Sequence, residues 1–379
     1  MRLTTAGESH GKALVAIIEG LPAHLQIDID KINAELALRQ SGFGRGGRQK
    51  IEKDKAEILT GVRNKETLGS PLTLCIYNND YQNWSSCMSD GDCDEEAMQA
   101  KRLTKVRPGH ADLTGAIKFD QADARNVLER ASARETAIRV AAGGIYKQYL
   151  SALGVEIGGY VQEICGVKDG GRYAFNQLHR AKQTQTGMLD EQAEALAIEK
   201  IKGLKTTGDT AGGIVEIRVK GLKRGFGNVM TYGEKLDAAL AQGLMSIQAI
   251  KGVEIGAGFA VGHTSGKDVH DEIYFDEERG YYRKTNRAGG IEGGMSNGEE
   301  IVIRVAMKPI PTLMKGLNTV DYATGQAATA ASERSDVCAI FALEIIAEAV
   351  VAEVLAKAVD KRLGGDTMAQ VKERYEKLR

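Results

Sequence analysis

Two histidines stand among glycines and small polar residues, a setting that suits proton transfer better than core packing. The chain has six histidines in 379 residues. His10 lies in the stretch GESHG, residues 7–11, and His110 lies in RPGHADL, residues 107–113. Imidazole exchanges protons near neutral pH, so both are candidates for acid–base catalysis. We expect the other four histidines to be structural, namely His24, His179, His263 and His270.

A basic, glycine-rich stretch lies in the first quarter of the chain. The segment LRQSGFGRGGRQK carries Arg39, Arg45, Arg48 and Lys50 and no acid. From the residues alone, three interpretations stay open. Guanidinium groups on a structured loop can bind the phosphate or carboxylate groups of a small polyanion. An RGG-like segment, residues 39–50, can bind RNA through charge and stacking, and the stretch can also be a solvated loop.

Other arginines recur beside small residues. Arg107 precedes PGHAD, and Arg130 and Arg134 lie in ERASARETAIR. The spacing of four predicts that Arg130 and Arg134 share one face of a helix, where they can bind an anion. In the alternative interpretation they pair with Glu129 and Glu135 of the same segment.

A third cluster, SERSDVC at residues 332–338, places Arg334 and Asp336 before the last long apolar segment. Together the clusters predict a small, anion-rich ligand that is held by arginines from distant parts of the chain. The hypothesis requires that His10 and His110 share one cavity.

Two glycine patterns resemble nucleotide-binding loops but stand in the wrong context. GFGRGG, residues 42–47, follows the helical stretch 30–40, whereas a dinucleotide fingerprint follows a strand and begins a helix. GHTSGK, residues 262–267, is too short for a Walker A loop and is followed by Asp268. Neither pattern supports a nucleotide site.

Composition indicates a globular chain without a global basic field. The net charge is −1, and the five cysteines are odd in number and form no C-x-x-C pair, which argues against a disulfide framework or a zinc site. We expect no metal, no signal peptide and a cytoplasmic location. The apolar segment 338–359 carries three glutamates and a lysine, so we predict a buried helix there and not a membrane span.

Hydrophobic periodicity predicts alternating strands and helices. We expect an α/β fold of the α+β type, a single domain over residues 1–379 with two loosely related halves. The predicted strands are 13–19, 71–77, 155–164, 213–221 and 299–308, and the predicted helices are 30–40, with Asp30 as a possible N-cap, 127–150 and 234–250.

Six motifs, taken together, resemble the chorismate synthase family over nearly the whole chain. They are GESHG, GFGRGGRQ, RPGHADL, RASARETAIRVAAG, GGIEGGMSNGE and KPIPTL, in this order and at the family's spacing. The resemblance implies a β-α-β layered sandwich and a homotetramer. It also implies 1,4-anti elimination of phosphate from 5-enolpyruvylshikimate 3-phosphate to give chorismate, with reduced FMN and no net redox change.

The resemblance also implies roles for particular residues. His10 protonates or stabilises the leaving phosphate, His110 protonates the reduced flavin, and Asp336 assists deprotonation through the flavin. The substrate carries one phosphate and two carboxylates, which we assign to Arg39, Arg45, Arg48, Arg107 and Arg134. Arg39 and Arg45 also match positions assigned in the family to a nicotinamide nucleotide, but we favour the substrate or flavin phosphates for them.

The flavin contacts implied by the motifs are Arg130, Ala131, Ser132, Gln248, Ala249, Gly293, Lys308, Pro309, Ile310, Pro311, Thr312 and Arg334. The chain departs from many members at RSDVC, where they have RHDPC, so that Ser335 and Val337 replace a histidine and a proline. We expect a monofunctional enzyme that receives reduced FMN from an external flavin reductase, with NADPH only as the indirect source of electrons. Two rival hypotheses are an RNA-binding protein that uses residues 39–50 and a different flavin or nicotinamide oxidoreductase.

Overall fold

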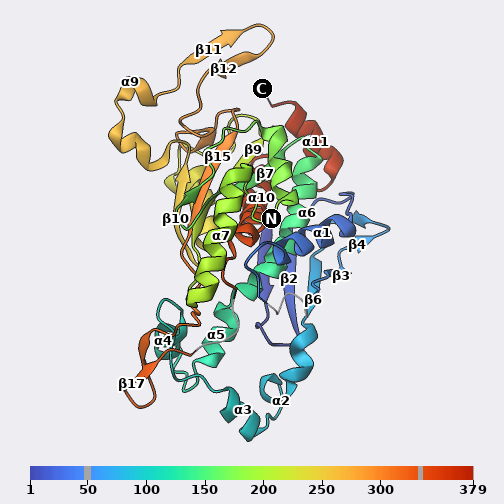
Figure 1. Ribbon diagram of the computed structural model, residues 1–379. Coiled ribbons are helices and arrows are strands. Elements are labelled where there is room, and N and C mark those ends of the chain that lie inside the picture. The colour runs from blue at the N-terminus through green and yellow to red at the C-terminus, as the bar shows by residue number, and fades with distance from the viewer. Residues whose placement is uncertain (47–52, 332–335, 379) are drawn as a thin grey trace.

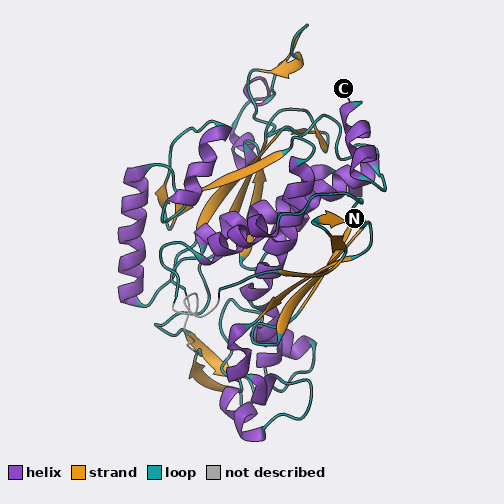
Figure 2. Cartoon of the chain, turned by 90° about the vertical axis from the view of Figure 1, so that its right-hand side faces the viewer, coloured by secondary structure: helices purple, strands orange, loops and turns teal. Residues whose placement is uncertain are grey.

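Two antiparallel sheets lie on either side of a layer of helices (Figures 1 and 2). The computed structural model describes residues 1–46, 53–331 and 336–378. This arrangement confirms the predicted mixed α/β fold with a β-α-β layer order. One hydrophobic core runs through all three layers, which favours the prediction of a single domain.

The first sheet is built from the N-terminal part of the chain. Its strand order is β1-β2-β6-β3. Leu14, Ala16 and Ile18 of β2 are buried in alternation with more exposed residues, as expected for a strand with one face on the core. The strands are β1 (Arg2–Ala6), β2 (Ala13–Glu19), β3 (Glu57–Thr60) and β6 (Leu72–Tyr77), and a small hairpin, β4 (Val62–Arg63) and β5 (Glu66–Thr67), lies beside them.

The second sheet belongs to the C-terminal half and has the order β10-β15-β9-β7-β8. Val215, Ile217 and Val219 alternate inward along its central strand, β9. The strands are β7 (Glu156–Ile164), β8 (Val167–Lys168), β9 (Gly213–Lys220), β10 (Ile250–Ile255) and β15 (Ile301–Met307). Three two-stranded hairpins project from this half, and they are β11 (Ile273–Asp276) with β12 (Gly280–Arg283), β13 (Ile291–Glu292) with β14 (Met295–Ser296), and β16 (Asn318–Asp321) with β17 (Gln326–Thr329).

Each sheet packs on its own long helix, and the two helices contact each other in the middle layer. The helix α6 covers β2 and β6, whereas α10 covers β7 and β9. Gly143 of α6 permits this contact, because an added Cβ would lie 2.3 Å from the Cβ of Ala349 on α10. The middle layer consists of α1 (Ile29–Gln40), α6 (Thr136–Ser151), α8 (Leu236–Met245) and α10 (Ile340–Leu363).

The remaining helices lie outside this layer. A lobe at the lower end of Figure 1 holds α3, α4 and α5 with the β16–β17 hairpin, and it has a small hydrophobic cluster of its own. The outer helices are α2 (Ser85–Met88), α3 (Glu95–Lys101), α4 (Asp112–Lys118), α5 (Arg125–Ala131), α7 (Glu191–Thr207), α9 (Gly266–Val269) and α11 (Met368–Glu376). Short 3-10 helices are η2 (Asn79–Asn83), η3 (Ala133–Glu135), η4 (Phe175–Gln183), η5 (Tyr232–Glu234) and η6 (Gly258–His263).

Two predicted helices are wrong in their extent. The segment 127–150 is broken into α5, the turn η3 and α6, because Ser132 is extended and its hydroxyl accepts a hydrogen bond from the Arg134 amide at 3.2 Å. The segment predicted as a helix over 234–250 ends at Met245. The predicted start of α1 also differs, since Asp28 and not Asp30 caps that helix.

The apolar segment 338–359 forms most of α10, which is buried as predicted. Two of its glutamates, Glu344 and Glu348, are fully buried, and Glu348 accepts hydrogen bonds from Lys147 at 2.5 Å and Lys182 at 2.9 Å. These ion pairs join α10 to α6 and to the turn η4. Within the ranges that the structure describes, no helix is long and apolar enough to cross a membrane.

Candidate active site

A cavity of about 560 Å³ opens at one end of the helical layer, between the two sheets. Its walls come from segments that are far apart in the sequence. They are residues 9–10, 39–46, 107–111, 131–136, 247–249, 307–312 and 336–346. Both His10 and His110 line the cavity, so the structure meets the condition that the sequence hypothesis set.

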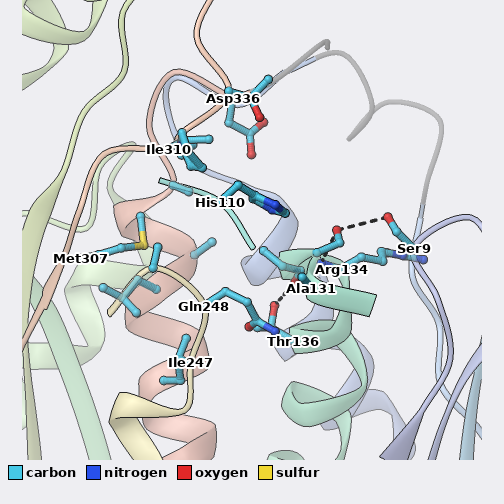
Figure 3. A pocket seen from close by; sticks show the side chains of 18 of the residues that line it. Ser9, His110, Ala131, Arg134, Thr136, Ile247, Gln248, Met307, Ile310 and Asp336 are labelled. Atoms are coloured by element: carbon cyan, nitrogen blue, oxygen red, sulfur yellow. Dashed lines mark hydrogen bonds between the residues drawn. The ribbon is translucent and has the colours of Figure 1, made fainter. Parts of the chain in front are cut away.

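The cavity has two different flanks. In Figure 3 the apolar side chains of Ile247, Met307 and Ile310 lie on one side, and Ser9 and Arg134 lie on the other. A flat apolar ring can pack on the first flank, while polar groups of a ligand meet the second.

Charge in the lining favours an anion. The cationic side chains are Arg39, Arg45, Arg107, Arg134 and Lys308. In the described part of the lining, Asp336 is the one carboxylate. The N-terminal ends of α6 and α10 also reach the wall, and helix N-termini carry partial positive charge. The field therefore suits phosphate and carboxylate groups.

The His10 ring is held on one edge and one face. Its Nδ1 lies 2.9 Å from each carboxylate oxygen of Glu129, and its backbone amide donates to Glu129 as well. Trp84 stacks on the ring at 3.9 Å between centroids. Because a carboxylate only accepts, we assign the Nδ1 proton to the bond with Glu129, and Nε2 is the ring nitrogen left for a ligand.

Glu129 is ionised in this setting. Burial opposes its charge, but the hydrogen bonds from His10 and the charges of His10 and Arg125 outweigh burial and hold the pKa of Glu129 below its usual value. Arg125 lies one helical turn earlier on α5, and its Nη1 is 3.2 Å from Glu129 Oε1. The carboxylate is thus shared between a guanidinium and an imidazole.

His110 has a similar carboxylate partner, although its own ring is somewhat more exposed than that of His10. Its Nδ1 lies 2.5 Å from Oδ1 of Asp112, whose side chain is fully buried. Arg107 donates to both oxygens of Asp112 at 2.8 and 3.0 Å, and its Nη1 donates to Thr312 Oγ1 at 2.9 Å. Burial alone would raise the pKa of Asp112, but the hydrogen bonds from His110 and Arg107 lower it well below its usual range.

Two more arginines meet at a buried carboxylate behind the cavity wall. Arg134 lies 2.7 Å from Asp54 and donates to Asn78 at 2.8 Å, and Arg39 reaches Asp54 at 3.6 Å. Arg39 also donates to the hydroxyl of Thr136 at the start of α6 at 3.0 Å. These contacts fix both guanidinium groups at the wall.

Arg45 and Asp336 form an ion pair at 2.9 Å, and the amide of Gly46 donates to the same aspartate at 2.5 Å. The described part of the basic segment, residues 39–46, is therefore a wall of the cavity. Arg39 is only 7% exposed, which does not suit a tract that binds RNA along its surface. The predicted residues Arg48 and Arg334, with Lys50, Ser335 and the rest of 47–52 and 332–335, lie outside the described residues.

Several residues that are expected to contact a flavin lie in the lining of the cavity. Ala131, Ser132, Gln248, Ala249, Lys308, Ile310, Pro311 and Thr312 all line the cavity. The side-chain oxygen of Gln248 is buried and has no hydrogen-bond partner in the described structure. Lys308 donates to the carbonyl of Gly109, and burial lowers the pKa of its ammonium group.

A chorismate synthase family model matches residues 1–359 of the chain. The chain belongs to the chorismate synthase family. The chorismate synthases of Geobacter sulfurreducens and Alkaliphilus metalliredigens are 51% and 52% identical to it, and in each case 99% of this chain and 98% of the relative are covered. A crystal structure of a chorismate synthase is 38% identical and matches with a TM-score of 0.79 over 99% of this chain and 96% of that one.

Membership of the chorismate synthase family confirms the resemblance that the six motifs indicated. It makes the chain an enzyme, a lyase of the shikimate pathway. The rival RNA-binding hypothesis is not favoured, because the family match covers the basic segment as part of an enzyme.

Three of the described residues expected from chorismate synthases are not in the lining of the cavity. Arg130 turns toward the first sheet, where it donates to the carbonyls of Gly7 and Thr5 at 3.1 and 3.3 Å. Gly293 lies in the turn between β13 and β14, and Pro309 stands between two lining residues without being one itself.

The predicted pairing within ERASARETAIR is also wrong. Arg130 and Arg134 do not share a helical face, because α5 ends at Ala131 and a 3-10 turn follows. Glu129 pairs with His10 and Arg125, while Glu135 accepts from Thr5 at 2.8 Å and lies near Gln248.

Sequence reasoning on the chorismate synthase motifs missed the groups that support the two histidines. Asp112 stands two residues after His110 in the quoted motif, so the spacing of the pair could have revealed it.

Glu129 is 119 residues from His10, and Asp54 is 80 residues from Arg134, so no local pattern links these partners. Trp84 contacts His10 from the segment after β6, and this pairing likewise depends on the fold.

Proposed function

We propose that the chain converts 5-enolpyruvylshikimate 3-phosphate to chorismate by 1,4-anti elimination of phosphate, with reduced FMN and no net redox change. The observation that carries the proposal is the single cavity of about 560 Å³ that joins His10, His110 and four arginines. The substrate has one phosphate and two carboxylates, and the lining matches that charge. We assign the substrate to Arg39, Arg45, Arg107 and Arg134, together with Arg48.

The cavity suits a flavin as well as the substrate. Its apolar flank offers a surface for a flat ring, and the buried, unpartnered oxygen of Gln248 is an acceptor for a ring N–H. We assign the cofactor to the residues from Ala131 to Ser132, Gln248 to Ala249 and Lys308 to Thr312, with Arg130, Gly293 and Arg334 from the family pattern. When bound, reduced FMN supplies transient electron density to the allylic system.

His10 acts on the leaving group in this proposal. Glu129 holds Nδ1, so Nε2 presents its proton to the cavity. A proton or a cation that meets the developing charge makes the departure of phosphate easier. As the C–O bond breaks, His10 donates to the phosphate, and the arginines of the wall stabilise its charge.

His110 and Asp336 act at the other end of the cavity, where Figure 3 shows them near each other. Asp112 holds Nδ1 of His110, so Nε2 is the ring nitrogen left to act on the cofactor. We assign Asp336 to assist the loss of the substrate's ring proton through the bound flavin. Its pairing with Arg45 keeps the carboxylate beside the cavity.

We also propose a cytoplasmic homotetramer that takes reduced FMN from a separate flavin reductase, so that NADPH contributes only indirectly. Exposed apolar side chains support self-association. Met230 and Tyr232 are each 88% exposed near the β13–β14 hairpin, and side chains of this kind are common in protein interfaces.

An anaerobic assay tests the proposed function. Protein with reduced FMN should release phosphate from the substrate, whereas aerobic protein with oxidised FMN should be nearly inert. His10→Ala and His110→Ala should each lower kcat about 10²-fold or more, as expected for a lost general acid. Glu216→Gln, a buried change on β9 outside the cavity, is the matched control. Phosphate release that persists without any flavin would overturn the proposal.

A further inference from the structure

The ring of His10 is enclosed by groups that no motif assigns to the reaction. Trp84 is the single tryptophan of the chain, and it lies between the 3-10 helix η2 and the helix α2. Its indole stacks on His10 with an angle of 23° between the rings. The indole N–H donates to Asp80 at 3.1 Å, which fixes the orientation of the ring.

A second set of contacts joins the same residues through charge. The guanidinium of Arg125 lies 5.3 Å from the Trp84 ring and 3.2 Å from Glu129. The ammonium of Lys101 lies 4.4 Å from the same indole. Glu129, Arg125 and Trp84 therefore form one connected group around His10.

We propose that Trp84 and Glu129 are positioning residues that hold His10 with Nε2 directed into the cavity. Glu129 fixes the edge of the ring that carries Nδ1, and Trp84 fixes its face. A flip of the imidazole would move Nδ1 away from Glu129, and a tilt of its plane would break the stack on Trp84. The proposal rests on the proposed function only for the statement that His10 transfers a proton.

Several charged groups lie around the His10 ring and the two residues that hold it. A carboxylate stabilises a neighbouring positive charge, and an aromatic face attracts a cation that stacks on it. The charged groups around His10 are Glu129 and Arg125 on α5, Lys101 on α3, and, along the cavity, Arg39, Arg45, Arg107, Arg134, Lys308 and Asp336. Any effect of Glu129 on the His10 ring is therefore exerted in the presence of these cations.

The single tryptophan gives a readout that needs neither flavin nor substrate. Protonated imidazole quenches the fluorescence of an indole in contact with it more strongly than neutral imidazole does. In the free protein, Trp84 emission should rise as the pH is raised through the range of about pH 5 to 8, in which histidine side chains in general change charge. His10→Gln should abolish this transition, and Glu129→Gln should reduce its amplitude, because a ring that the carboxylate no longer holds stacks less firmly on the indole.

Steady-state kinetics supplies the second readout. Glu129→Gln should lower kcat about 10-fold to 100-fold, and Trp84→Leu about 10-fold, with KM changed less than twofold, since misplacing a catalytic group acts on the transition state. Trp84→Phe keeps an aromatic face and should recover most of the rate. Glu216→Gln should match the wild type in both measurements.

Two results would overturn the positioning role: an emission transition that survives in His10→Gln, or variants that raise KM while kcat stays unchanged. If the wild type makes no chorismate but the emission transition depends on His10 and Glu129, the proposed function fails and the positioning of His10 stands.

Discussion

The two histidines of the cavity have the same kind of partner but differ in how that partner is held. Asp112 is fully buried, and Arg107 donates to both of its oxygens and to Thr312. Glu129 accepts from one nitrogen of Arg125, and Trp84 stacks on the face of the His10 ring that Glu129 holds. The His110 side is therefore a closed ion-pair network, whereas the His10 side combines one ion pair with an aromatic stack.

This difference shows that two histidines with the same proposed role, proton transfer, can be held by contacts that contribute differently to the stability of the fold. A buried carboxylate with a bidentate arginine is expensive to disrupt, because either partner alone is a buried charge. An aromatic contact can be lost without leaving a charge behind. We therefore expect stability to depend on the His110 side more than on the His10 side.

The largest expected effect is on the His110 side. Asp112→Asn removes the negative charge between Arg107 and His110 and should lower the free energy of unfolding by about 3 kcal/mol, as for a broken buried ion pair. Glu129→Gln should cost less, about 2 kcal/mol, within the range for a hydrogen bond to a charged group, because the amide oxygen can still accept from His10 and Arg125. Urea unfolding at pH 7 measures both. Equal losses in the two variants would contradict the comparison.

Much of the fold could be predicted from local patterns. The strand 13–19 was predicted with its observed bounds because Leu14, Ala16 and Ile18 alternate with residues of the exposed face. The break at Ser132 could not be predicted from periodicity, since its neighbours are good helix formers and the turn depends on a hydroxyl that bonds to a backbone amide.

The residues that line the site could largely be predicted from the sequence, but the side chains that hold them in place could not. His10 and His110 stood out by their neighbours, but Glu129 reaches His10 across 119 residues of chain. Such a pairing is decided by how α5 packs beside the N-terminal strands, and no spacing rule contains it. Asp112, two residues from His110, is the partner that a closer look at the motif could have found.

The second prediction concerns acid stability. The pKa values of Asp112 and Glu129 are lower in the folded protein than in the unfolded chain, so protons bind more tightly to the unfolded chain. The stabilisation is complete above roughly pH 4 to 5 and is lost as the pH falls through the lower folded values. Between pH 7 and 3, Asp112→Asn and Glu129→Gln should each lose less stability than the wild type. The same pH dependence in all three proteins would show that other carboxylates dominate.

The smallest expected effect tests the outer anchor of the Arg107 network. Thr312→Val removes the hydroxyl that accepts from Arg107 at 2.9 Å, and it should cost about 1 kcal/mol of unfolding free energy. Thr319→Val, which removes a hydrogen bond to Val106 in the same lobe, is the matched control. If Thr312 acts through Arg107, Thr312→Val should lower the free energy of unfolding less in the Asp112→Asn variant than in the wild type. Thr319→Val should lower it equally in both proteins. Additive losses for Thr312→Val would mean that the hydroxyl stabilises the loop by itself, and the His110 side would then be no more tightly connected than the His10 side.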